Sequence, residues 1–171
     1  MALAMNKTFD PAQASTHELF TVFGAVLKEL RARGVIRSAN NPIADYAELL
    51  FEKALRLERA PKSTTGYDAT DCNGAKYEIK GRRITAHNRS RQLSSIRGLD
   101  QRHFDFLAGV LFAEDFSVMR ACLIPYAQVV EHSTYVGHTN SARFLLADAV
   151  WVLPGVIDVT AKLLEAEKAH G

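Results

Sequence analysis

An Asn-Gly pair at Asn73-Gly74 is the feature that most restricts how this chain of 171 residues can fold. Asn-Gly between two short runs of alternating polar and apolar residues is a strong signal for a β-hairpin, because both residues tolerate the left-handed backbone of a tight turn. The two runs flank the pair within residues 66–80. The sequence therefore predicts a hairpin there, with its turn near Asn73-Gly74.

Turn length decides which acid of the first strand meets Glu78 on the second. A two-residue turn at Asn73-Gly74 puts Asp71 on the face of Glu78. A three-residue turn that begins at Cys72, with its glycine in a left-handed bulge, puts Asp68 directly opposite Glu78. The residues by themselves leave both registers open.

The second strand also determines which side chains lie beside that acid. Successive side chains of a strand point to opposite faces, so Glu78 and Lys80 share one face while Tyr77 and Ile79 share the other. An apolar pair facing inward would hold the polar pair in a cleft or at the sheet surface. Two carboxylates beside an ammonium group are what metal-assisted phosphodiester cleavage requires.

The order Tyr67-Asp68, tight turn, Glu78-Ile79-Lys80 resembles the PD-(D/E)XK nuclease superfamily, in a bacterial-type branch. Tyr67 stands where the name of the motif has proline. The resemblance implies that Asp68 and Glu78 bind Mg²⁺ or Mn²⁺ together with the backbone carbonyl of Ile79, and that Lys80 positions the attacking water. It favours the register that places Asp68 opposite Glu78.

The same resemblance implies an α/β fold with a restriction-endonuclease-like core, a mixed central sheet flanked by helices. The expected order is αβββαβ, with one element less certain, over roughly residues 40–130. The implied activity is metal-dependent endonuclease hydrolysis of DNA, in restriction or repair, with a homodimer or a specificity partner protein as further expectations. Two alternatives stay open: an inactive nucleic-acid-binding module of the same fold, and an unrelated α/β protein whose charged hairpin is ordinary surface.

A helix over residues 42–57 is expected before the hairpin, because Asn41-Pro42 provides an N-cap and a proline in the first turn. Its apolar face comprises Ile43, Tyr46, Ala47, Leu50, Phe51 and Ala54. Glu48 lies at the edge of this face, where a carboxylate can reach a cleft in the sheet. The resemblance makes Glu48 a fourth site residue, and the alternative is a solvated helix residue.

Positive charge is concentrated after the hairpin. Residues 76–102 carry a balance of +6 in a chain whose net charge is +2, so the remainder is net negative. Such a segment beside the site suits a nucleic-acid backbone, and a solvated basic surface is the alternative. The candidate nucleic-acid contacts are Arg82, Arg83, Asn88, Arg89, Arg91 and Gln92. By resemblance, Gln92 matches a polar residue on a helix after the Glu-x-Lys strand.

The remaining pattern predicts one domain over residues 1–171: a helical extension (1–40), the core (41–130) and a completing segment (131–171). Ser15 and Glu18 have capping-box spacing in the extension. Strands are expected at 104–112 and 118–124, a short helix from Pro125, and a terminal helix at 158–169. Residues 133–154 show no motif, and a second nucleic-acid contact through Thr139, Asn140 and Arg143 stays open.

Membrane contact is not expected. No apolar run is long enough to span a bilayer, and the first residues lack the layout of a secretory signal. A cytoplasmic location is the resulting expectation.

Overall fold

The computed structural model describes residues 9–38, 42–61 and 64–169. The chain forms two compact units, Met1–Ala39 and Asn40–Gly171, which are described in turn. Asn41, the predicted N-cap, lies outside the described residues.

The first unit contains a short 3₁₀ helix, η1 (Pro11–Gln13), and one long helix, α1 (Thr16–Ala32). The predicted capping box is confirmed: the Glu18 amide donates to Ser15 Oγ at 3.3 Å, and the Ser15 amide donates to Glu18 Oε2 at 2.8 Å. Beyond the helix, Gly34 adopts a left-handed backbone with φ of 70°, which ends the helical run.

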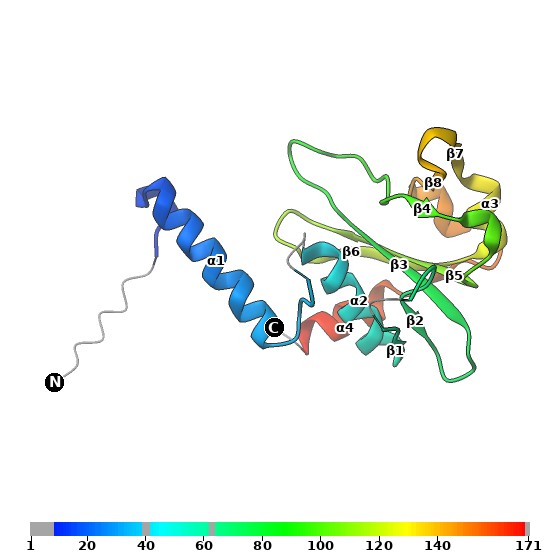
Figure 1. The fold of residues 1–171 in the computed structure, drawn as a ribbon, viewed down its shortest axis with the longest axis horizontal. Helices are drawn as coiled ribbons and strands as arrows, with labels where there is room; N and C mark the ends of the chain where they lie inside the picture. The colour runs from blue at the N-terminus through cyan, green and yellow to red at the C-terminus, as the bar shows by residue number, and fades with distance from the viewer. Residues whose placement is uncertain (1–8, 39–41, 62–63, 170–171) are drawn as a thin grey trace. The chain divides into compact units, whose positions relative to one another are not determined.

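The second unit is built on a six-stranded mixed sheet with the order β1-β2-β3-β5-β6-β9 (Figure 1). Its strands are β1 (Glu58–Arg59), β2 (Ala69–Thr70), β3 (Lys76–Arg83), β5 (Phe106–Phe112), β6 (Val118–Pro125) and β9 (Ile157–Asp158). β3 and β5 run parallel, and every other neighbouring pair is antiparallel. The predicted α/β class with a mixed sheet is confirmed, as are the two strands after the hairpin.

Helices α2 (Pro42–Leu55) and α4 (Thr160–Lys168) cover one face of this sheet (Figure 1). As predicted, α2 turns an apolar stripe inward, and Ala47, Leu50 and Phe51 are completely buried. They pack with Ile79 of β3 and Leu163 of α4. Within the described ranges, no helix has the length and apolar character needed to cross a bilayer.

A second layer covers the other face. It consists of helix α3 (Tyr126–His132) and a small sheet in the order β4-β8-β7. The strands of this sheet are β4 (Ile96–Arg97), β7 (Thr134–Val136) and β8 (Ser141–Arg143), and short 3₁₀ helices lie at η2 (Leu99–Gln101), η3 (Gly137–Thr139) and η4 (Asp148–Val152). Leu93, Ile96 and Phe144 are buried between this layer and the main sheet.

The connection between β3 and β5, residues 84–105, contains no α-helix, although all of it is described. The helix that the resemblance implies after the Glu-x-Lys strand is therefore missing. Gln92, expected on that helix, instead forms an isolated β-bridge with Leu145. Extended backbone buries Leu93 in this segment, and the left-handed residues Gly98 and Arg102 bound its only helical turn.

Gly81 lets α2 lie close to β3. A Cβ atom at this position would lie 3.0 Å from Ile43 Cγ2, 3.1 Å from Ala47 Cβ and 3.1 Å from a ring carbon of Phe112. We expect Gly81→Ala to lower the free energy of unfolding by about 1–3 kcal/mol, because the helix must shift away from the strand. Urea denaturation of the full chain measures this.

Gly137→Ala is the control for that substitution, because a Cβ there would make only an ordinary contact of 3.8 Å with Tyr135. Equal effects of the two substitutions on the urea midpoint would contradict tight packing at Gly81.

Candidate active site

The β2–β3 hairpin has the longer of the two predicted turns. Thr70 lies opposite Lys76, so that Asp68 is next in register with Glu78. Gly74 takes the left-handed conformation with φ of 83°, as the bulged turn requires. The register that places Asp68 opposite Glu78 is therefore the observed one.

Asp71, the competing acid, holds the turn together instead. Its Oδ1 accepts hydrogen bonds from the amides of Asn73 and Ala75, both at 2.9 Å, and its Oδ2 accepts one from the Tyr77 hydroxyl at 3.3 Å. This is the usual use of aspartate at the first position of a turn. It also explains why the chain turns where it does.

Asp68 is held against the neighbouring strand, where its Oδ2 accepts a hydrogen bond from the Ile79 amide at 2.7 Å. Burial, reinforced by the charge of Glu78, raises the pKa of Asp68 from 3.8 to about 6, against the opposing effects of Lys80 and the Ile79 amide. At neutral pH the Asp68 carboxylate is thus charged, although its burial and the nearby charge of Glu78 disfavour the charged form. A bound cation would relieve this.

Lys80 and Glu78 form a close ion pair, with Lys80 Nζ 2.5 Å from Glu78 Oε1 and side-chain exposures of only 17% and 13%. Burial alone would lower the pKa of Lys80, but the charges of Glu78 and Asp68 outweigh it, so that the pKa is raised. The ammonium is therefore protonated throughout the physiological range. The predicted trio of Asp68, Glu78 and Lys80 is brought together.

Glu48 reaches this trio from helix α2. Its negative charge raises the pKa of both Asp68 and Lys80, so that it lies within electrostatic range of each. The structure thus brings Asp68, Glu78 and Lys80 together and places Glu48 within electrostatic range of them.

Asp105 is a supporting residue that the sequence analysis did not identify. Its Oδ2 accepts a hydrogen bond from the Lys76 amide at 2.9 Å, and its own amide donates to the Lys76 carbonyl at 2.8 Å. These contacts fix the start of β3 beside β5 and so align Glu78 and Lys80. The sequence signal for this role is an acidic residue directly before an apolar run that forms a buried strand.

Arg82 and Arg83, two of the residues predicted to contact nucleic acid, form hydrogen bonds with loops of the protein itself. Arg82 Nε donates to the Ser90 carbonyl at 2.9 Å, which ties β3 to the following connection. Arg83 Nε donates to the Glu114 carbonyl at 2.8 Å, and its guanidinium lies 4.2 Å from the centre of the Phe116 ring. Each guanidinium keeps further N–H donors beyond these contacts.

The other predicted contacts lie along the connection. Arg91 pairs with Asp148, which it reaches at 2.7 Å and shares with Arg120. Asn88 and Arg89 are exposed, and the Asn88 side chain accepts a hydrogen bond from the Ser90 amide. The basic segment is thus spread along one extended connection rather than displayed on a helix.

Sequence comparison finds neither a matching protein-family model nor a matching curated protein.

The donor atoms at the site suit a hard divalent cation. Asp68 and Glu78 supply carboxylate oxygens, and the Ile79 carbonyl directly follows Glu78 in sequence. In the described part of the chain, no group of three or more His, Cys, Asp or Glu side chains is arranged to hold a metal. Mg²⁺ typically keeps several waters and binds through one or two carboxylates, which is the set that Asp68 and Glu78 offer.

Proposed function

We propose that this protein is a Mg²⁺- or Mn²⁺-dependent endonuclease of the PD-(D/E)XK type that hydrolyses phosphodiester bonds in DNA. The observation that carries the proposal is that Asp68, directly before β2, lies close to Glu78 and Lys80 on the adjacent strand β3. The raised pKa of Asp68 adds support, because crowded, buried carboxylates are typical of sites that bind cations.

Asp68, Glu78 and the Ile79 carbonyl would hold the metal ion. When bound, the ion would polarise the scissile phosphate and make a bound water more acidic. Lys80 would orient the attacking water and offset negative charge that develops on the phosphate. Glu48 would add negative charge at the border of the site.

The basic residues after Lys80 would carry the DNA backbone. Arg82 follows Glu78 and Lys80 on the same face of β3, and Arg89 is exposed farther along the connection. Binding through such residues releases counterions from DNA, so affinity should fall steeply with salt concentration.

A restriction-endonuclease-like core forms part of this proposal. Its support is the succession of α2, the strands β1 to β3, and β5 parallel to β3. The missing helix between β3 and β5 is a departure from the αβββαβ plan.

An inactive nucleic-acid-binding module of the same fold is the second candidate. It is favoured by the same missing helix and by the direct contact of Lys80 with Glu78, which neutralises one of the two carboxylates. This candidate keeps salt-sensitive DNA binding and loses metal-dependent cleavage.

Incubation with supercoiled plasmid, linear duplex and single-stranded DNA separates the candidates. With Mg²⁺ or Mn²⁺ we expect nicked and linear products from the parent protein, and none with EDTA. We also expect Mn²⁺ to raise the melting temperature of the parent protein and not that of Glu78→Gln, because the variant loses a metal ligand.

Glu58→Gln is the matched control for Glu78→Gln, since Glu58 is an exposed acid in β1 of the same sheet. It should cleave and respond to Mn²⁺ like the parent. Salt-sensitive DNA binding without cleavage under any of these conditions would favour the inactive module, and absence of DNA binding would exclude both candidates.

A further inference from the structure

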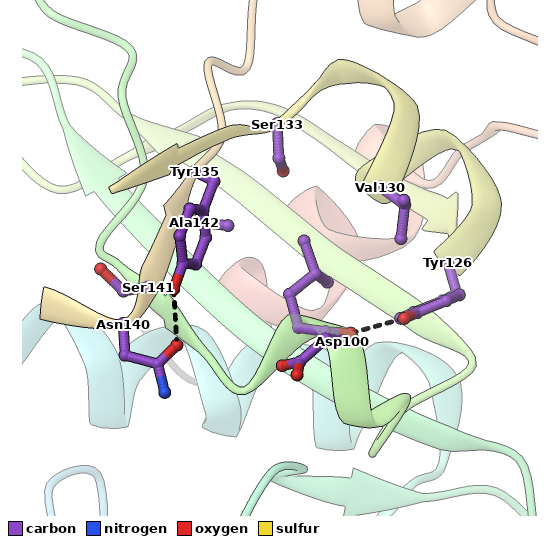
Figure 2. Close-up of a pocket in the computed structure, with 9 residues that line it drawn as sticks. Asp100, Tyr126, Val130, Ser133, Tyr135, Asn140, Ser141 and Ala142 are labelled. Carbon is purple, nitrogen blue, oxygen red and sulfur yellow. Dashed lines mark hydrogen bonds between the residues drawn. The ribbon is translucent and has the colours of Figure 1, made fainter. Parts of the chain in front are cut away.

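A separate pocket of about 220 Å³ lies in the second layer of the molecule, among η2, α3 and the strands β7 and β8 (Figure 2). Leu99, Val130 and Ala142 contribute carbon to its walls, together with the rings of two tyrosines, Tyr126 and Tyr135. Drug-sized ligands usually occupy pockets of roughly 300 Å³ or more. The volume therefore suits a smaller molecule, about the size of one heterocycle.

Ser133 gives this pocket an unused polar group. Its Oγ is buried and has no hydrogen-bond partner among the described residues. Figure 2 shows the hydroxyl pointing from the end of α3 toward the interior of the pocket. Buried hydroxyl groups are nearly always hydrogen-bonded, so an unpartnered one in a pocket wall indicates a missing ligand group.

Asp100 is an exposed acidic residue that provides an acceptor. Its carboxylate lies at the pocket edge and has no ion pair or hydrogen bond with any described residue. Across the pocket, the Tyr135 hydroxyl donates to Asn140 Oδ1 at 3.0 Å, which leaves the NH₂ group of Asn140 to donate. The pocket thus combines apolar walls with acceptors and a donor at separate points of its rim (Figure 2).

We propose that this pocket binds a nucleobase that carries an amino group. A planar ring would lie against the tyrosine and aliphatic walls, and its amino group would donate to Asp100 while Ser133 and Asn140 meet other edge atoms. Arg102 lies outside, with its guanidinium 5.5 Å from the centre of the Tyr126 ring, where it can meet a phosphate. The proposal does not depend on the nuclease function.

Calorimetric titration of the metal-free full chain with cytidine 5′-phosphate, uridine 5′-phosphate and ribose 5-phosphate tests it. We expect cytidine 5′-phosphate to bind most tightly, because uridine lacks the amino group. Asp100→Asn should weaken this binding about tenfold, the loss of one charge-assisted hydrogen bond. Ser133→Val should also weaken the binding of cytidine 5′-phosphate about tenfold, because the valine side chain fills part of the pocket.

Thr134→Ala is the matched control, because Thr134 is the exposed neighbour of Ser133 on β7 and does not line the pocket. Its affinity should equal that of the parent, and melting curves establish that each variant is folded. Asp68→Asn should also leave nucleotide binding unchanged, so failure of the nuclease proposal and failure of this one give different results.

Single-stranded oligonucleotides identify the source of the base. Tighter binding of a cytidine-containing oligonucleotide than of the same strand with an abasic site in place of the cytidine assigns the pocket to a base within nucleic acid. Binding of the free nucleotide with no such difference assigns it to a soluble nucleotide. The proposal is overturned if neither ligand binds at millimolar concentration, if ribose 5-phosphate binds equally well, or if Asp100→Asn has no effect.

Discussion

Replacing Lys80 with methionine should lower the rate of DNA cleavage about a hundredfold to a thousandfold while increasing the stabilisation by Mn²⁺. Lys80 Nζ contacts Glu78 directly and also acts on Asp68, so its positive charge competes with a divalent cation for both carboxylates. Methionine has a similar length and no charge. The variant should therefore bind the metal more tightly and lack the group that we propose to orient the attacking water.

Single-turnover cleavage at pH 8 and melting temperatures across a Mn²⁺ series measure these opposite effects. Lys76→Met is the control, because Lys76 lies on the same strand and face but is exposed at the strand end. It should cleave at close to the parental rate. A Lys80→Met protein that is folded without metal and shows parental cleavage would remove Lys80 from the mechanism.

Replacing Asp68 with asparagine should abolish cleavage and yet stabilise the protein at neutral pH. Burial and the charge of Glu78 raise the pKa of Asp68 to about 6, compared with 3.8 for the free side chain. The folded state therefore binds more protons than the unfolded state between these values, and its stability falls as pH rises through this range. The full penalty is present well above pH 6, as at pH 7.5, and asparagine avoids it.

We expect Asp68→Asn to raise the free energy of unfolding by about 1–3 kcal/mol at pH 7.5 and to have little effect at pH 4. Asparagine Oδ1 can still accept the hydrogen bond from the Ile79 amide. Urea denaturation without metal at both pH values measures the difference, with Glu58→Gln as the exposed control. Destabilisation at pH 7.5 would show that the charged carboxylate is favourable in the fold, contrary to this account.

Local signals predicted the hairpin and its surroundings. A left-handed glycine after Asn73 and an aspartate at the start of the turn fix the register through contacts within a few residues. The apolar stripe of α2 likewise follows from helical periodicity, and it places Glu48 near the sheet. The choice of Asp68 over Asp71, however, rested on family resemblance, and the turn hydrogen bonds now give it a physical reason.

The connection between β3 and β5 could not be predicted in this way. Its structure depends on distant partners: Gln92 pairs with Leu145, and Arg91 with Asp148. Such contacts leave no periodic pattern in the segment itself. The pocket around Ser133 could not be predicted for the same reason, because its walls come from four elements that are separate in the sequence.

The site and the connection also differ in how far along the chain their contacts reach. The bond from the Ile79 amide to Asp68 spans only 11 positions, whereas pairing of β3 with β5 must close the whole of 84–105. Hairpins form within microseconds, and doubling the length of a flexible loop costs only about 0.6 kcal/mol. Changes of length in the exposed part of the connection, residues 86–90, should therefore leave the arrangement of Asp68, Glu78 and Lys80 intact.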